Sequence, residues 1–421
     1  MKLTFHQSTT SPALPFDIIS LIIDIVGGTN DTDVLKELAL VSHFFHQICS
    51  KHLFATIELR DAITKRDIPS SKRGFVKLLK SRPDVIKHIR KLVYYLEAND
   101  RPQSSPTKSS SVNNDHLISN ILPDSLRTIP RLNCLEIYAS CLDWNSVDSS
   151  LTSAFLHLMH LPSMNHIDLS CISNFPLAIL AASDNLLRFE MSQLEEDGCE
   201  LVVESEIMPK IRELHISESF QLTTKLLLAK LQDGRPAFRF MNLIRLSIAF
   251  TRLEDKRIFL HFMQNARLLT RLNLSIGFEQ NLMGIHHILS LRARTLRAIE
   301  MTLSLHSEGP TRLPLAGLCK ELEAMAGNNI LEILSFDVVV EEHDTEDSIG
   351  PVIQDIEKAL LKPGWPVLKH VSLKITSMAT VTNEEGDKFN EALQFLPEKY
   401  LSHLSKHESI TFYYATDIWT Y

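Results

Sequence analysis

One apolar pattern recurs along most of the chain: an apolar residue, two variable residues, an apolar residue, one variable residue and a third apolar residue. The last two apolar positions are two residues apart, so they share one face of a strand. The copies are Leu132/Leu135/Ile137, Met164/Ile167/Leu169, Leu186/Phe189/Met191, Ile211/Leu214/Ile216, Leu243/Leu246/Ile248, Leu269/Leu272/Leu274, Leu296/Ile299/Met301, Leu331/Leu334/Phe336 and Leu368/Val371/Leu373, with Ile89/Leu92/Tyr94 as a further candidate. Each copy predicts a short strand with one buried face.

Between these copies lie stretches whose apolar residues are three and four apart, which is the spacing of one helix face. They cover residues 222–231, 256–266, 282–291, 315–325 and 353–361. Strands that alternate with helices predict an α/β fold with a parallel sheet, and the recurrence favours a curved solenoid. An ordinary α/β domain that uses leucine-rich strands is the alternative.

The N-terminal segment follows a helical pattern instead. Residues 14–26 carry apolar residues at helical spacing after Pro15, which predicts a helix that Gly27-Gly28 ends. Capping oxygens precede a second helix that runs to Val41, Ser42 can cap a third helix over 43–53, and residues 54–59 alternate as a short strand does. Three such helices display more apolar side chains than their small core can hide, so they either bind a partner or pack on the rest of the chain.

The order of motifs in this segment resembles the F-box, especially the expanded F-box families of fungi. The matching runs are Leu14-Pro15-x-Asp17-Ile18-Ile19, Leu38-Ala39-Leu40-Val41-Ser42-His43-x-Phe45 and Leu53-Phe54. F-box proteins bind a Skp-type adaptor that connects them to a cullin-RING ubiquitin ligase, so the resemblance implies that this chain selects a protein substrate for ubiquitination. The positions that match the motif, and that we expect to bind the adaptor, are Leu14, Pro15, Ile18, Ile22, Leu38, Val41, Phe45, Leu53 and Phe54.

The apolar copies resemble the irregular leucine-rich repeats common in F-box proteins. Together the two resemblances imply a flexible N-terminus (1–13), an F-box-like helical module (14–59) and an irregular leucine-rich-repeat domain (60–421) of parallel strands and helices. Residues 97–116 are rich in Ser, Pro, Asn and charges, so we predict a disordered insertion between repeats there.

The residue between the last two apolar positions of each copy lies on the opposite face of its strand. These residues are Glu136, Asp168, Glu190, His215, Ser247, Asn273, Glu300, Ser335 and Ser372. We expect them to form a polar row on the concave side, where Glu136, Asp168, Glu190, His215, Asn273 and Glu300 are candidate substrate contacts. Because four members are acidic, one hypothesis is a somewhat basic substrate surface. A sheet face that is polar only because it is solvated is the alternative.

Composition narrows the classes of partner. The chain has 43 Lys+Arg against 51 Asp+Glu, a net charge of -8, which disfavours non-specific binding to nucleic acid or anionic membranes. Its six cysteines lack CxxC spacing and are expected to be buried thiols. The sequence has neither a signal-like apolar segment nor a run of about 18 apolar residues, so we expect a cytoplasmic or nuclear protein that does not span a membrane.

The sequence contains none of the motifs HExxH, GxSxG, GxxxxGK[ST] or GxGxxG. His43, His46, Cys49 and His52 are three apart and therefore sweep around a helix, so they cannot all face one ion. We expect no cofactor, no metal and no catalytic residue. Three hypotheses follow: a substrate receptor of a ubiquitin ligase, a leucine-rich interaction scaffold without a ubiquitin role, and an enzyme with an unrecognised site.

Overall fold

The computed structural model describes residues 14–29, 31–60, 71–96, 121–194, 202–203, 209–250, 255–277, 284–304, 313–327, 329–341, 346–379 and 384–420. The expected flexible N-terminus (1–13) and disordered insertion (97–116) lie outside these ranges. The chain is an α/β protein with two compact units. The first comprises Met1–Leu142 and Ser146–Met164, and the second comprises Asp143–Asn145 and Asn165–Tyr421.

The first unit begins with three helices: α1 (Phe16–Gly28), α2 (Thr32–Val41) and α3 (His43–Leu53). The Ser42 hydroxyl accepts a hydrogen bond from the Phe45 N–H at 3.3 Å, which caps α3 as predicted. The predicted end of the first helix is wrong, because α1 includes both Gly27 and Gly28. Gly27 lies against the ring of His52 so closely that a Cβ would overlap it, so this glycine provides close packing between helices instead of a stop.

These three helices bury a small cluster of side chains. Its members are Ile23, Leu35 and Cys49, with Ile19, Val26, Leu38, Ala39, Phe45, Ile48 and Leu53 packed around them. Within each helix the members recur every three or four residues, as Ile19, Ile23 and Val26 do in α1, which is the spacing of a buried stripe. The cluster therefore takes up only part of the apolar surface that the helices carry.

A parallel sheet completes the first unit. The sheet and its helices comprise β1 (Thr56–Leu59), α4 (Ser71–Ser81), the 3-10 helix η1 (Pro83–His88), β2 (Lys91–Leu96), β3 (Cys134–Asp143) and α6 (Ser149–Met159). The 3-10 helix η3 (Trp144–Ser146) follows β3, and its first two residues belong to the second unit. The strands pair in the order β1-β2-β3. Tyr94 of β2 is fully buried, with its ring 4.9 Å from that of Phe155 and 4.7 Å from the Lys72 ammonium. The core of this unit lies between the sheet and its helices.

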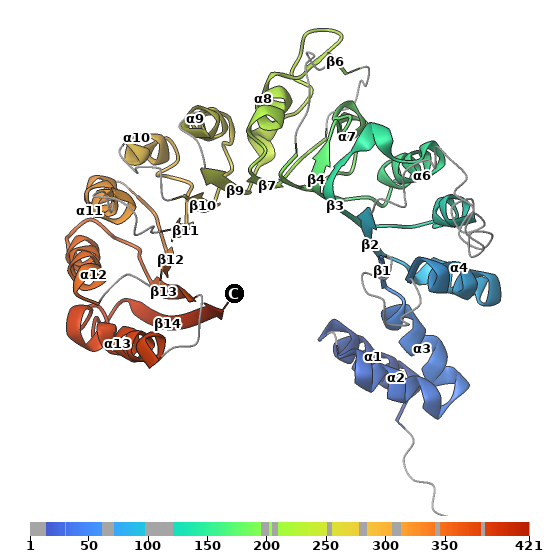
Figure 1. Ribbon diagram of the computed structural model, residues 1–421, viewed down its shortest axis with the longest axis horizontal. Helices are drawn as coiled ribbons and strands as arrows, with labels where there is room; N and C mark the ends of the chain where they lie inside the picture. Colours follow the sequence, from blue (N-terminus) through green and yellow to red (C-terminus); the bar gives the residue numbers. More distant parts are fainter. Residues whose placement is uncertain are drawn as a thin grey trace, which may run out of the picture. The chain divides into compact units, whose positions relative to one another are not determined.

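The second unit alternates strands with helices along most of its described length. Its strands are β4 (His166–Ser173), β5 (Arg188–Ser192), β6 (Val202–Val203), β7 (Glu213–Ser217), β8 (Lys230–Leu231), β9 (Arg245–Phe250), β10 (Arg271–Ile276), β11 (Ala298–Ser304), β12 (Ile333–Glu341), β13 (His370–Ala379) and β14 (Thr411–Thr420). Its helices are α7 (Ala178–Ala181), α8 (Phe220–Leu228), η4 (Phe240–Asn242), α9 (Asp255–Asn265), α10 (Ile285–Ser290), α11 (Leu313–Met325), α12 (Glu346–Leu361) and α13 (Glu384–Tyr400). The main sheet runs β4-β5-β7-β9-β10-β11-β12-β13-β14, all parallel, and β6 pairs with β8. Within this unit the strands lie along the inner side of a curve and helices α8 to α13 along its outer side (Figure 1).

The last two apolar residues of every predicted copy lie in a strand, the first one lies just before it, and neighbouring copies are in register. Leu246 of β9, for example, is opposite Leu214 of β7 and Leu272 of β10, and all three side chains are buried. The register keeps one face of the sheet apolar along its length, and the helices cover this face. The C-terminal segment, which none of the predicted apolar copies covers, is strand β14, which places Phe412 opposite Val371.

The predicted helices are present with shifted ends. The stretch predicted over 222–231 is wrong at its end, because α8 finishes at Leu228 and Lys230–Leu231 forms β8. The last two residues of the predicted stretch, Lys230 and Leu231, pair with β6, so strand pairing takes the place of a further helical turn. Among the helices of the described ranges, none is both long enough and apolar enough to cross a membrane.

Buried glutamates connect successive repeats of the second unit. Glu321 of α11 accepts hydrogen bonds from the backbone N–H groups of Gly284 and His286, at 2.9 and 2.8 Å, at the start of α10. Glu357 of α12 accepts from the N–H groups of His403 and Leu404, both at 2.8 Å. Each carboxylate therefore satisfies backbone donors of another repeat that would otherwise be unpaired.

The expectation of buried cysteines is only partly right. Cys49 is buried, but Cys141 is exposed. Cys141 has φ 52°, in the left-handed region, so the alternation of the strand breaks there and its side chain leaves the core. Cys171 and Gln193 also have left-handed backbones, and the Cys171 thiol donates a hydrogen bond to the Gln193 amide oxygen at 2.8 Å.

Candidate functional site

Helix α1 has two apolar faces one residue apart in sequence. Ile19 and Ile23 face the cluster with α2 and α3, and Ile23 is only 1% exposed. Ile18 and Ile22, each one residue earlier, are 39% and 47% exposed. One residue turns a helix by about 100°, so the apolar stripe is roughly twice as wide as a single contact face. The outer half of this stripe is free to bind a partner.

The structure divides the nine predicted adaptor contacts into two sets. Exposed side chains belong to Leu14, Pro15, Ile18, Ile22 and Val41. Leu38, Phe45 and Leu53 instead pack on the cluster around Leu35 and Cys49, and Phe54 is half-buried at the end of α3. The first set is available for contact, whereas the second set supports the helices that carry it.

The same helices expose further large apolar residues that the motif did not include. We define the N-terminal apolar surface by the exposed side chains of both kinds: Leu14, Phe16, Ile18, Leu21, Ile22, Ile25, Val34, Leu40 and Val41. Leu40 is the most exposed, at 87%. The signal was present in the sequence, because Leu21 and Ile25 lie four residues apart and continue the helical spacing of Ile18 and Ile22. Concentrations of exposed apolar side chains of this kind mark interaction sites in soluble proteins.

The predicted polar row is a continuous line across the second unit. Strand register places successive members opposite one another, in the order Asp168, Glu190, His215, Ser247, Asn273, Glu300, Ser335 and Ser372. All are half-buried or exposed, on the face away from the helices. The row follows directly from the period of two within each strand and the common register of the apolar residues.

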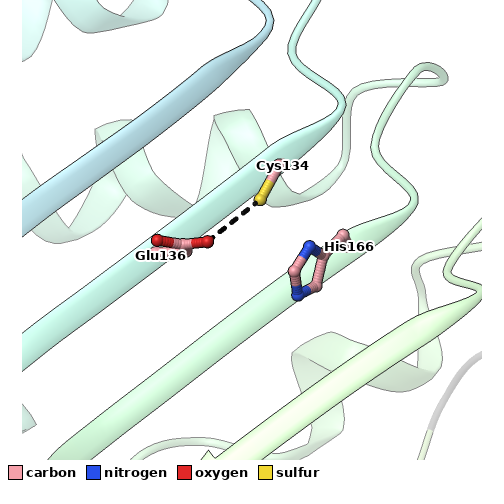
Figure 2. A group of neighbouring side chains, drawn as sticks. All are labelled: Cys134, Glu136 and His166. Atoms are coloured by element: carbon pink, nitrogen blue, oxygen red, sulfur yellow. Dashed lines mark hydrogen bonds between the residues drawn. The ribbon is translucent and has the colours of Figure 1, made fainter. Parts of the chain in front are cut away.

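Glu136, on β3 of the first unit, does not match its predicted exposure. It is only 8% exposed. The Lys91 ammonium is 2.5 Å from Oε1 of Glu136. The Cys134 thiol donates a hydrogen bond to the same oxygen at 3.6 Å, which Figure 2 shows as a dashed line. Tyr138 donates to the other oxygen at 3.3 Å. This carboxylate is therefore engaged within the chain and is a poor candidate for substrate contact.

Glu190 of β5 is also paired within the chain. Its Oε1 lies 2.9 Å from Nε2 of His166 and 2.6 Å from Nε of Arg188. The hydrogen bond from His166, reinforced by Arg188, lowers the pKa of Glu190 to about 2 against burial, which acts to raise it. Two of the four acidic residues in the predicted row are thus neutralised by cations, and the case for a basic substrate surface weakens accordingly.

Sequence reasoning missed three arginines that accompany the row. Arg188, Arg245 and Arg271 are the first residues of β5, β9 and β10, two positions before members of the row and on the same face. They and three glutamates line a hollow of about 260 Å³ in the exposed sheet face. Its lining is Arg188, Glu190, Glu213, Leu214, His215, Arg245, Ser247, Arg271, Leu272, Asn273, Ala298 and Glu300. Extending the period of two backwards by one step would have found them.

The charges in the hollow are unevenly paired. Glu213 Oε2 lies 3.7 Å from NH1 of both Arg188 and Arg245. Arg271 lies opposite Arg245 in the register, is exposed, and makes no ion pair with any described residue. Adjacent strands are about 4.8 Å apart, so the two arginines are neighbours in the register. Glu213 lies beside Arg245, whereas Ala298, opposite Arg271 on β11, carries no charge.

The histidines and the cysteine of α3 do not gather into one site. His46 contacts Ser50 and Arg82, Cys49 is buried, and Nε2 of His52 is 2.8 Å from Asp24, so these predicted non-converging residues have separate partners. Burial raises the pKa of the Cys49 thiol, which disfavours a reactive thiolate. Glu190 stays ionised and paired near neutral pH, which does not suit a general acid.

No protein-family model matches the chain, and no curated protein matches it significantly in sequence.

Proposed function

We propose that this chain is the substrate-recognition subunit of a Skp-cullin-F-box ubiquitin ligase. Helices α1 to α3 are an F-box-like module that binds a Skp-type adaptor. The strands and helices that follow are irregular leucine-rich repeats, and their exposed sheet face binds a target protein. The chain acts in the cytoplasm or nucleus and contributes binding, not catalysis.

The observation that carries this proposal is the N-terminal apolar surface. It contains four of the nine residues that the F-box resemblance assigns to adaptor binding, and a fifth, Pro15, is also exposed at the start of α1. The remaining four support the same helices from within. Burying several exposed Ile, Leu and Phe side chains is the main favourable term in protein association. A separate polar face on the repeats supports a second, independent contact with a target.

The test is a pull-down of the full chain with a purified Skp-type adaptor. Wild-type protein should bind, and Ile18→Asp/Ile22→Asp should lose binding, because two carboxylates would be buried without partners. Leu268→Asp is a matched control, since Leu268 is 53% exposed and lies between α9 and β10 of the second unit. It should bind like the wild type. If the wild-type chain fails to bind the adaptor, the ubiquitin role is wrong.

A leucine-rich interaction scaffold, in which the three helices only cap the repeats, is the second candidate. It is favoured by the connection between the helices and the first sheet, where the N–H groups of Arg90 and Lys91 both donate to the Ala55 carbonyl, at 2.8 and 2.9 Å. In a scaffold the Ile18→Asp/Ile22→Asp variant would keep every partner of the wild type. The adaptor pull-down therefore separates the two functions.

A further inference from the structure

We propose that the hollow in the exposed sheet face of the second unit binds an oxyanion on a target protein, a side-chain carboxylate or a phosphorylated side chain, through Arg245 and Arg271. This inference rests on the proposed role of the repeats in target binding. It also reverses the charge that the acidic row first suggested for the target.

The first argument is the imbalance of charge at one point of the register. Arg245 and Arg271 lie directly opposite each other on β9 and β10. Glu213 approaches Arg245 from the β7 side at 3.7 Å, whereas on the β11 side Arg271 faces Ala298, which carries no charge. Like charges directly opposite each other on adjacent strands are unfavourable, so an anion between the two guanidinium groups would relieve their repulsion.

The second argument is the set of groups around the two arginines. His215, Ser247 and Asn273 line the same hollow on β7, β9 and β10, and each side chain has at least one hydrogen-bond donor. A planar guanidinium group can donate two parallel hydrogen bonds to the oxygens of one carboxylate or phosphate group, and neutral donors satisfy the remaining oxygens. The volume of about 260 Å³ suits the end of one side chain better than a whole small-molecule ligand.

The third argument concerns specificity. Glu190 is already held by His166 and Arg188, whereas the contact of Glu300 with a described residue is a long hydrogen bond, 3.4 Å, from Asn273. Glu300 therefore places a carboxylate at the β11 side of the hollow, where it disfavours a second anion. The target segment should carry a single acidic group with neutral or basic neighbours, and an acidic run should bind more weakly.

Inorganic phosphate is the first probe, with the full chain and chloride at matched ionic strength as reference. Phosphate should raise the thermal denaturation midpoint of the wild type in a saturable way. Arg271→Gln should weaken phosphate binding by about tenfold, because it removes a charge-assisted contact. Arg267→Gln is the matched control: Arg267 is exposed outside the hollow and should leave the response unchanged. Equal responses in both variants, or none in the wild type, would overturn the proposal.

Peptides then distinguish the two sources of the oxyanion. Three otherwise identical peptides would carry serine, glutamate or phosphoserine at one position between neutral residues. Binding of the glutamate or phosphoserine peptide that Arg245→Gln/Arg271→Gln abolishes supports a carboxylate or a phosphorylated side chain, respectively. Equal binding of all three peptides would show that the hollow does not read an anion, and the inference would be wrong.

Adaptor binding keeps this inference separate from the proposed function. The Arg245→Gln/Arg271→Gln variant should bind the Skp-type adaptor like the wild type, and Ile18→Asp/Ile22→Asp should bind phosphate like the wild type. Loss of the phosphate response with intact adaptor binding rejects only the hollow. Loss of adaptor binding by the wild-type chain with an intact phosphate response rejects only the ubiquitin role.

Discussion

Arg245 and Arg271 lie directly opposite each other on the neighbouring parallel strands β9 and β10. Glu213 lies 3.7 Å from Arg245, while Arg271 has no ion-pair partner among the described residues. The arrangement does not stabilise the free protein, because two like charges share one stretch of sheet. It fits the oxyanion site that we propose, and it makes the contribution of Arg271 to stability measurable.

Replacing Arg271 by glutamine should therefore not destabilise the free protein. We expect the free energy of unfolding to rise by about 0.2–1 kcal/mol at low salt, since the repulsion with Arg245 is lost. The gain should vanish in about 1 M salt, where the Debye length is only about 3 Å. Urea denaturation at both salt concentrations, in buffer without phosphate, measures this difference. A clear loss of stability at low salt would mean that Arg271 has a structural partner.

The pairing of Glu190 with His166 and Arg188 should appear as a pH dependence. The folded-state pKa of Glu190 is about 2, below its ordinary value of 4.5, so the ionised form stabilises the fold. This stabilisation is fully present above about pH 4.5 and is lost as the pH falls toward 2. Glu190→Gln should lower the free energy of unfolding by about 1–3 kcal/mol near neutral pH.

The difference between wild type and Glu190→Gln isolates this group from the other carboxylates. It should shrink on acidification through the same window, as followed by urea denaturation at several pH values. Glu300→Gln is the matched control, because Glu300 occupies the same row without an ion pair to a described residue. A difference that stays constant with pH would show that the ion pairs of Glu190 do not stabilise the protein.

The sheet could be predicted from sequence because each strand repeats the same apolar spacing. Once Leu246 and Leu272 are aligned as equivalent positions, their register and the polar row beside them follow from the alternation of a strand. The pairing of strands that are distant in sequence could therefore be predicted from the short apolar pattern that each strand carries. The C-terminal strand β14 lacked a full copy of the pattern, and its assignment needed the neighbouring strand β13.

The sites were harder to predict because they depend on which neighbours a side chain meets. Ile22 and Ile23 are the same residue type in the same helix, yet one is 47% exposed and the other 1%. The helical period alone cannot choose between two apolar faces of equal quality. Glu136 forms an ion pair with Lys91, which is 45 positions away along the chain, so the sequence did not show that this carboxylate is engaged within the chain.

Replacing each of the two adjacent glycines at the end of α1 by alanine should change the free energy of unfolding in opposite directions. No described atom lies within 4 Å of the Cβ position of Gly28, so Gly28→Ala should stabilise the protein by about 0.4–1 kcal/mol by restricting the unfolded chain. Gly27→Ala would overlap the His52 ring and disturb its 2.8 Å contact with Asp24. We expect a loss of about 1 kcal/mol from that crowding. Urea denaturation monitored by helical circular dichroism compares the two, and equal effects would contradict the close packing of α1 on α3.

The neighbouring isoleucines of α1 allow binding and folding to be tested separately. Ile22→Asp places a charge on the N-terminal apolar surface, where it stays hydrated, so the free energy of unfolding should change by no more than about 0.5 kcal/mol. Ile23→Asp buries the same charge beside Leu35 and Cys49 and should cost about 3–5 kcal/mol. Adaptor affinity and urea denaturation, measured on both variants, then separate a loss of binding from a loss of stability. Ile22→Asp should lose the adaptor while keeping its fold, and a stable Ile22→Asp protein that still binds the adaptor would move the contact away from this face of α1.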